Sequence, residues 1–307
     1  MKLICRVAPH LRCEDNTKNI MLDVIIALAP ATVFGVFLFG FSALLTVATC
    51  VAAAVSCEAL CCYIAKKSLT TSDLSAVVTG LILALNLPAG IPLYMAALGS
   101  VFAIVCCKVL FGGIGKNIVN PAIGGRVFLL VAFSSAMTTF REPFSDVIAA
   151  ATPLVAEKVT FKELFFGVTA GSIGETSALM LLLGGIYLVG RKVIRLEIPL
   201  SFIGTVFLMA LIFGQNPFNA VFSGGLLLGA IFMATDYVTS PMTSAGKIVF
   251  GIGCGVLTML IRLFATLPEG VSYSILVMNL LAPLIDRFFV SSPLGAKRIK
   301  KGERDDA

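Results

Sequence analysis

The sequence predicts an all-α polytopic membrane protein with about ten transmembrane helices. Of the 307 residues, 58% are hydrophobic and only 13% are charged, and the mean hydropathy is +1.00. Apolar runs recur between short polar breaks from Leu22 to Phe289. This is the pattern of helices that satisfy their own backbone hydrogen bonds in hydrocarbon, and it excludes a soluble domain.

The predicted helices follow one another with short connections. They begin near residues 22, 44, 74, 92, 121, 176, 199, 217, 247 and 271. Two of the apolar runs, 74–87 and 176–190, are short for a bilayer, so we expect them to be tilted, broken or to reach only part-way across. The first run follows a polar tail without a small-residue cleavage site, which indicates a retained span and not a signal peptide.

The basic residues indicate the orientation of the chain. The net charge of +6 comes from Lys and Arg in the breaks between spans, and no basic patch of the kind that binds nucleic acid is formed. The positive-inside rule then predicts an even number of spans with both termini cytoplasmic, because the short breaks assigned outside lack Lys and Arg. The predicted divisions are a cytoplasmic tail, a first membrane half, an extracytoplasmic loop, a second membrane half and a second cytoplasmic tail, at residues 1–20, 21–139, 140–175, 176–290 and 291–307.

No metal site is predicted. The nine cysteines include the adjacent pairs Cys61-Cys62 and Cys106-Cys107 but no CxxC pair, so we interpret them as small residues that pack between membrane helices. The single histidine, His10, lies in the N-terminal tail, which excludes histidine-based catalysis or metal binding inside the membrane.

Three short motifs recur in the same order in the two membrane halves. They pair Ala76–Gly80 with Ala220–Gly224, Lys108–Phe111 with Arg262–Phe264, and Asn120–Ala122 with Asn279–Pro283. Because the predicted topology places the two copies in opposite orientations, the matches predict an inverted five-helix repeat. This architecture resembles that of urea-channel-like proteins, in which paired broken helices build a site between the halves. The repeat alone leaves open a channel or transporter of that type without a redox role.

One segment of the extracytoplasmic loop carries a hydroxyl group with small residues before it. Asp146 precedes Thr152 by six residues, Ala149 to Ala151 lie between them, and Pro153 follows. A bulky phosphoryl donor could approach a threonine in such an accessible loop. Considered alone, the segment is a small-residue loop that leads to a proline.

Much of the chain resembles a family formed by the D subunit of Rnf electron-transport complexes and the B subunit of Nqr complexes. The resemblance runs from Ala8 to about Phe289 and is carried by Met21–Pro30, Asp73–Gly80, Ala84–Pro88, Leu110–Ala122, Gly171–Ala178 and Thr235–Pro241. The compact N-terminus favours Rnf over Nqr. The resemblance implies a bacterial inner-membrane subunit of an ion-translocating complex that couples electron transfer between ferredoxin and NAD to Na+ or H+ transport. It also implies the other Rnf proteins as partners: the flavin-bearing G subunit, the membrane-embedded A and E subunits, and the iron-sulfur B and C subunits.

The same resemblance implies a covalent cofactor. Members of the family carry a short motif that begins with an aspartate and ends with a threonine. A flavin transferase joins the phosphate of FMN to this threonine as an ester. The segment from Asp146 to Thr152 resembles this motif. This chain has Ala149 where the family usually has Ser or Thr, and Ala150 where it has Gly. A structural scaffold in which Thr152 is never modified is therefore an alternative.

A second, non-covalent flavin is implied at the cytoplasmic side. In the related Nqr subunit the motifs that match Asn120 and Asp236 are expected near riboflavin, and we expect the same of these two residues. Capping of helix ends is the alternative role for both.

Two further groups of polar residues are candidates for binding. On the side of Thr152, Gly174 and the small polar residues Thr176 and Ser177 could cradle the flavin at a helix N-terminus. Capping of that helix by Thr176 or Ser177 is the alternative. Asp73 and Glu58 are candidates for a cation path because hard cations prefer carboxylate oxygen, although both could be boundary caps or solvated charges.

Overall fold

A computed structural model describes residues 16–66, 71–144, 161–167, 169–265 and 270–289. Within these ranges the chain is helical and contains no β-strand, although Pro88 and Ser172 form an isolated antiparallel bridge. The all-α prediction is therefore confirmed.

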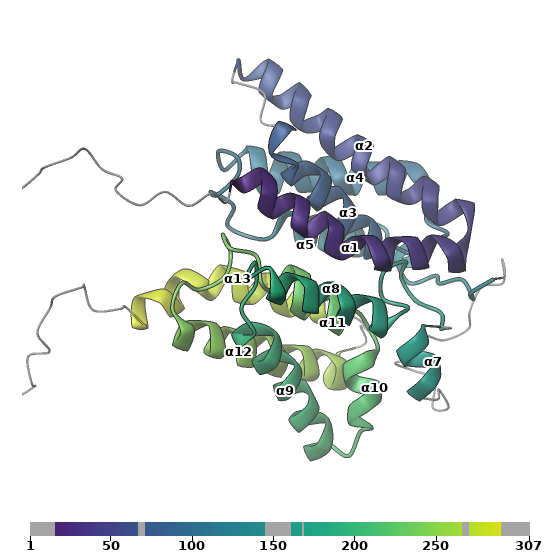
Figure 1. Cartoon of the computed structure of the whole chain (residues 1–307), viewed down its shortest axis with the longest axis vertical. Coiled ribbons are helices and arrows are strands. Elements are labelled where there is room, and N and C mark those ends of the chain that lie inside the picture. The colour runs from purple at the N-terminus through teal and green to yellow at the C-terminus, as the bar shows by residue number, and fades with distance from the viewer. Residues whose placement is uncertain (1–15, 67–70, 145–160, 168, 266–269, 290–307) are drawn as a thin grey trace, which may run out of the picture.

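The first group of helices lies together in the upper part of Figure 1. It consists of α1 (Thr17–Phe39), α2 (Phe41–Ile64), α3 (Ser75–Leu85), α4 (Leu93–Ile104) with its π-helical continuation η2 (Val105–Val109), and α5 (Pro121–Ala132). Two short pieces accompany them, η1 (Thr71–Asp73) and α6 (Ser134–Met137), whereas the short helix α7 (Phe161–Phe166) lies with the second group.

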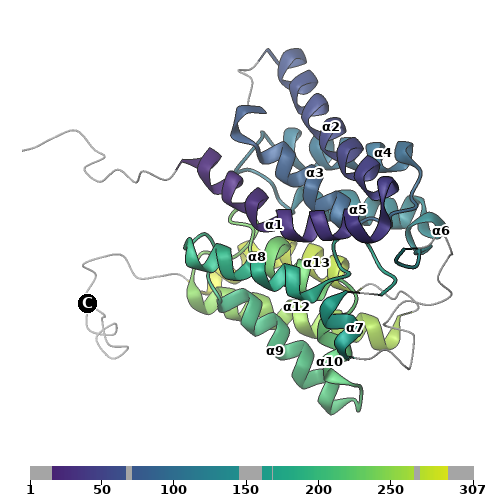
Figure 2. The same ribbon diagram turned by 45° about the vertical axis from the view of Figure 1, so that its right-hand side comes forward.

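The second group lies below the first. It consists of α8 (Ala178–Gly190), α9 (Glu197–Ile212), α10 (Pro217–Phe222), α11 (Leu226–Leu228) with its π-helical continuation η3 (Gly229–Met233), α12 (Ser244–Phe264) and α13 (Val271–Phe288). Contacts between the groups run mainly from α1 to α8 and from α5 to α13 (Figure 2). The start of α1 and the end of α13 lie on the same side of the molecule (Figure 1).

Several helices begin where their sequence signals indicate. Asn120 precedes Pro121, and its side chain accepts from the backbone N–H of Ala122, so α5 starts with an N-cap and a proline in its first turn. Asn216 and Pro217 open α10 in the same way. These local signals determine where the short helices begin, which the apolar runs alone would not.

Four helices are long and apolar enough to cross a bilayer. They are Thr17–Phe39, Phe41–Ile64, Ser244–Phe264 and Val271–Phe288. Large apolar side chains on their surfaces are exposed, such as Phe37 at 68% and Phe264 at 75%, which is the arrangement that lipid contact requires. The chain is thus a membrane protein. All ten predicted starts lie near helix starts, but the count of ten spans stays a prediction because the other helices are shorter.

The two runs predicted to be short are the short helices α3 and α8, each of which has one end inside the protein. The residues at the end of α3, Leu85, Asn86 and Leu87, are no more than 1% exposed. The segment before α8 supplies hydrogen-bond donors for two of these carbonyl groups. Gly174 N–H donates to Leu85 O at 2.8 Å, and Ile173 N–H donates to Leu87 O at 3.0 Å. Backbone that leaves a helix at this depth is tolerated because protein surrounds it.

Helix α8 packs closely against α1 at Gly184. A methyl group on Gly184 of α8 would overlap the carbonyl oxygen of Ala27 in α1. We expect Gly184→Ala to cost about 1–3 kcal/mol, as overpacking of a core does, and to lower the unfolding midpoint of the purified protein in detergent. Gly204→Ala in α9, where a methyl group meets nothing within 4 Å, is the matched control and should not lower it. Equal midpoints for the two variants would contradict the close packing.

Candidate functional site

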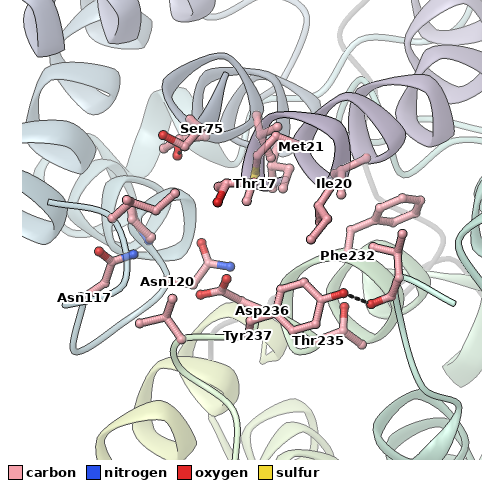
Figure 3. A pocket seen from close by; sticks show the side chains of 18 of the residues that line it. Thr17, Ile20, Met21, Ser75, Asn117, Asn120, Phe232, Thr235, Asp236 and Tyr237 are labelled. Carbon is pink, nitrogen blue, oxygen red and sulfur yellow. Dashed lines mark hydrogen bonds between the residues drawn. The ribbon is translucent and has the colours of Figure 1, made fainter. Parts of the chain in front are cut away.

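A pocket of about 350 Å³ lies between the two groups of helices. Its walls come from α1, α3, the loop between η2 and α5, the ends of α8 and η3, and the loop after η3 (Figure 3). The lining is mostly apolar, with Ile20, Val24, Val78, Ile82 and Phe232 among it. Apolar walls with a few convergent polar groups are typical of sites for small organic ligands.

Asn120 holds one wall of the pocket in place. It is 5% exposed, and its side-chain oxygen caps α5 by accepting from Ala122 N–H at 3.0 Å. Its side-chain amide donates to the carbonyl oxygen of Met233 at 3.1 Å. Since Met233 ends η3, a single side chain links the first and second groups of helices. The predicted capping role is confirmed, and it leaves the binding role as a prediction.

Asp236 lies in the same pocket, as Figure 3 shows, with its carboxylate directed toward the Asn120 side chain. It belongs to the loop between η3 and α12 and accepts a hydrogen bond from Thr239 Oγ1 at 3.0 Å. The solvent exposure of Asp236 is intermediate, and the pocket walls surround its carboxyl group. This burial raises the pKa of the carboxyl group above its ordinary value. The structure thus brings together Asn120 and Asp236, which are distant in sequence.

A buried lysine occupies the opposite wall. Lys108, in the π-helical segment η2, donates to Glu58 Oε1 at 2.7 Å and to Ser75 Oγ at 2.6 Å. Ser75 in turn donates to Asp73 Oδ1 at 2.5 Å. The two carboxylates predicted as candidates for a cation path therefore lie in one cluster, and the Lys108 ammonium lies at its centre. Asp73 also caps α3 through Ser75 N–H at 2.9 Å, which is the capping alternative.

One ion pair near the pocket was not predicted. Asp23 of α1 accepts from Tyr187 at 2.8 Å and pairs with Arg191 at 3.3 Å, both at the end of α8. This contact fastens α1 to α8 beside the pocket, which both helices line. The signal in the sequence was an aspartate inside the apolar stretch Met21–Pro30, because a charge there needs a partner.

The other predicted site residues lie at the far end of α8. Ser177 caps this helix by accepting from Met180 N–H at 3.4 Å, while Leu188, about 16 Å along the helix at 1.5 Å per residue, lines the pocket. Thr176 and Ser177 are buried at 3% exposure, and Gly174 packs against Leu85. Asp146 and Thr152 lie outside the described residues. The predicted residues thus form a pocket group and a separate group at the opposite end of α8.

Sequence reasoning also missed Arg126, a buried arginine of α5 that pairs with Glu175 at 3.1 Å. Its signal was a lone arginine inside an apolar helix. Among the described residues, no group of three or more His, Cys, Asp or Glu side chains could hold a metal ion.

A protein-family model described as the NQR2, RnfD, RnfE family matches residues 4–295. The chain belongs to this family. The match extends through both groups of helices and includes both sides of the pocket.

Relatives within the NQR2, RnfD, RnfE family are similar over almost the whole chain. The D subunit of the Na+-translocating ferredoxin:NAD+ oxidoreductase complex of Acetobacterium woodii is 45% identical over 311 residues, which cover 98% of each chain. The D subunit of the proton-translocating ferredoxin:NAD+ oxidoreductase complex of Clostridium ljungdahlii is 44% identical over 316 residues, 95% of this chain and 96% of that one. The D subunit of an ion-translocating oxidoreductase complex of Stutzerimonas stutzeri is 40% identical, over 89% of this chain and 91% of that one.

The raised pKa of Asp236 predicts a pH dependence of stability. The folded chain holds the proton of this carboxyl group at a pH where the unfolded chain, with a pKa near 3.8, has released it. The unfolded state therefore gains relative stability as pH rises from about 4 through the raised pKa, and the free energy of unfolding falls. Asp236→Asn removes this term, so its thermal midpoint should fall less than that of the wild type over the same range. Parallel curves would contradict the burial of an ionisable group at this position.

Proposed function

We propose that this chain is the flavin-bearing membrane subunit of an ion-translocating Rnf complex, which couples electron transfer between ferredoxin and NAD to Na+ or H+ transport. The observation that carries the proposal is the 45% identity over 98% of both chains with a D subunit of such a complex. The chain would act as one electron carrier of a translocase and would hold no complete active site by itself. Its partners would be the flavin-bearing G subunit, the membrane-embedded A and E subunits, and the iron-sulfur B and C subunits.

The covalent cofactor would be FMN, esterified through its phosphate to Thr152 in the motif that begins at Asp146. The described flank of this loop supports the assignment. Phe144 N–H donates to Leu38 O at 2.9 Å, so the loop departs from the end of α1 that is opposite to Thr17 and the pocket. At 1.5 Å per residue the 23 residues of α1 extend roughly 35 Å, about the thickness of a bilayer. The attachment loop and the pocket would then lie on opposite sides of the membrane.

The pocket is our candidate for the second, non-covalent flavin, riboflavin. Its volume of about 350 Å³ lies within the range of organic cofactor sites. A flavin supplies one- and two-electron redox chemistry when bound, and the protein positions it. The apolar side chains of α1, α3 and η3 would contact the ring faces, while Asn120 and Asp236 would hydrogen-bond a polar edge.

We also propose the inverted five-helix repeat, with about ten spans and both termini on the cytoplasmic side of the inner membrane. The two basic residues that the repeat equates each contact the first motif of their own half or the residue directly before it. Lys108 reaches Ser75, beside the motif Ala76–Gly80, and Arg262 reaches the carbonyl groups of Ala220 and Gly224 at the ends of the matching motif. Because this repeat is the feature that favours a urea-channel-like transporter, that is the second candidate function.

The covalent flavin separates the two candidates. Thr152→Ala removes the ester oxygen, so the FMN-sized mass and the in-gel flavin fluorescence of the denatured chain should vanish, and ferredoxin-dependent NAD reduction by the complex should collapse. Thr139→Ala, an exposed threonine of the same connection, is the matched control and should retain both. A wild-type chain without an adduct supports the transporter or an unmodified scaffold instead.

The pocket flavin has an independent test. Thr79→Phe places a ring in the cavity from α3, and we expect the flavin that acid releases from the purified complex to drop by about one per chain, since displacement removes the buried contacts. Val131→Phe, on the exposed face of α5, is the control and should release as much as the wild type. Unchanged release from Thr79→Phe would place the non-covalent flavin elsewhere.

A further inference from the structure

A buried arginine lies deep in the molecule, where the two groups of helices meet. Arg126 is 2% exposed and belongs to α5, six residues beyond Asn120 at the pocket. At 1.5 Å per residue it lies about 9 Å deeper than the pocket wall. An arginine inside a membrane protein is costly and needs partners, so its place calls for a functional explanation.

The partners of Arg126 come from two broken segments. Its guanidinium donates to the side-chain oxygen of Asn86, directly after α3, and to Glu175 Oε1 at 3.1 Å, in the segment before α8. The Glu175 side chain is 7% exposed. It also lies against Gly225, the left-handed residue that opens α11, where a methyl group would overlap the carboxylate. Three interruptions of helices therefore meet around one ion pair.

Polar contacts connect this ion pair to the pocket. Asn120 donates to Met233 O at 3.1 Å, the Asn86 amide donates to Met233 Sδ at 3.3 Å, and Asn86 accepts from Arg126. We call this series, from Asn120 through Met233, Asn86 and Arg126 to Glu175, the polar column. Buried polar groups between two halves of a membrane protein mark a place where water or ions could cross. The Arg126 guanidinium lies in this column between Asn86 and Glu175.

We propose that Arg126 seals the midline between the two halves against cations. A guanidinium keeps its charge at every physiological pH, and a fixed positive charge in a low-dielectric interior is an electrostatic barrier to Na+ and to protons. Glu175 holds the guanidinium in the column and offsets its burial. The ions that the complex moves would then take a route outside the polar column. The proposal concerns the barrier alone and does not depend on where flavins bind.

Passive ion flux tests this barrier. The assembled complex is reconstituted in vesicles without electron donor, and the influx of Na+ and of protons is measured. Arg126→Gln removes the positive charge and should raise passive cation influx about tenfold or more, a factor that corresponds to about 1.4 kcal/mol in the barrier. Glu175→Gln breaks the same ion pair but keeps the charge of Arg126, so it should stay as tight as the wild type. Arg262→Gln, which removes a half-buried arginine bonded to backbone carbonyls away from the column, is the matched control and should also stay tight.

Removal of one partner can prevent folding, because it leaves a buried charge uncompensated. The double variant Arg126→Gln/Glu175→Gln avoids this and differs from Glu175→Gln only in the charge at position 126. It should leak more than Glu175→Gln, and complex assembly and covalent flavin content are measured alongside. Equal influx through these two variants, or a leak through Glu175→Gln as large as that through Arg126→Gln, would overturn the proposal.

Discussion

The structure depends on one constraint: every polar group that is taken into the apolar interior must be satisfied there by protein. Ending α3 at Leu85 would expose carbonyl groups at depth, and the segment that leads to α8 supplies their donors, with Gly174 N–H and Ile173 N–H on Leu85 O and Leu87 O. The Asn86 side chain adds a bond of 2.7 Å to Ile82 O. The same constraint brings Glu175 to Arg126. The path of the chain between its two halves is thus set by where broken helices need partners.

Both π-helical segments line the pocket and deliver its polar contacts. In η2 the wider turn places Lys108 against Glu58 and Ser75, and at the end of η3 the Met233 carbonyl is available to Asn120. A π-helical turn leaves carbonyl groups out of the ordinary i to i−4 pattern, and such turns are frequent at functional sites. Neither segment could be predicted from the apolar pattern, which has no period that separates π from α.

Much of the fold was predictable from the sequence, because long apolar runs and local caps are sequence signals. Asn120 with Pro121 marks the start of α5, and the shortness of 74–87 marks a broken helix. The site was predictable in part: the resemblance chose Asn120 and Asp236, and the fold brings them to one pocket. The pairs Asp23 with Arg191 and Arg126 with Glu175 were not, because tertiary packing alone decides which charge meets which. Lone charges at 23 and 126 indicated that partners existed, without identifying them.

Electrons and cations make opposite demands on the centre of such a protein. Electron transfer between two cofactors needs a packed medium and no continuous water, whereas a cation needs replacement of its hydration shell along its whole route. Under the proposed function, flavins on opposite sides of the membrane would be separated by the column from Asn120 to Glu175, which is dense, hydrogen-bonded and closed by a permanent positive charge. That arrangement would keep the two flavins on their own sides of the membrane without an ion leak between them. Since a leak through the midline would dissipate the gradient that the complex builds, coupling itself would require the seal.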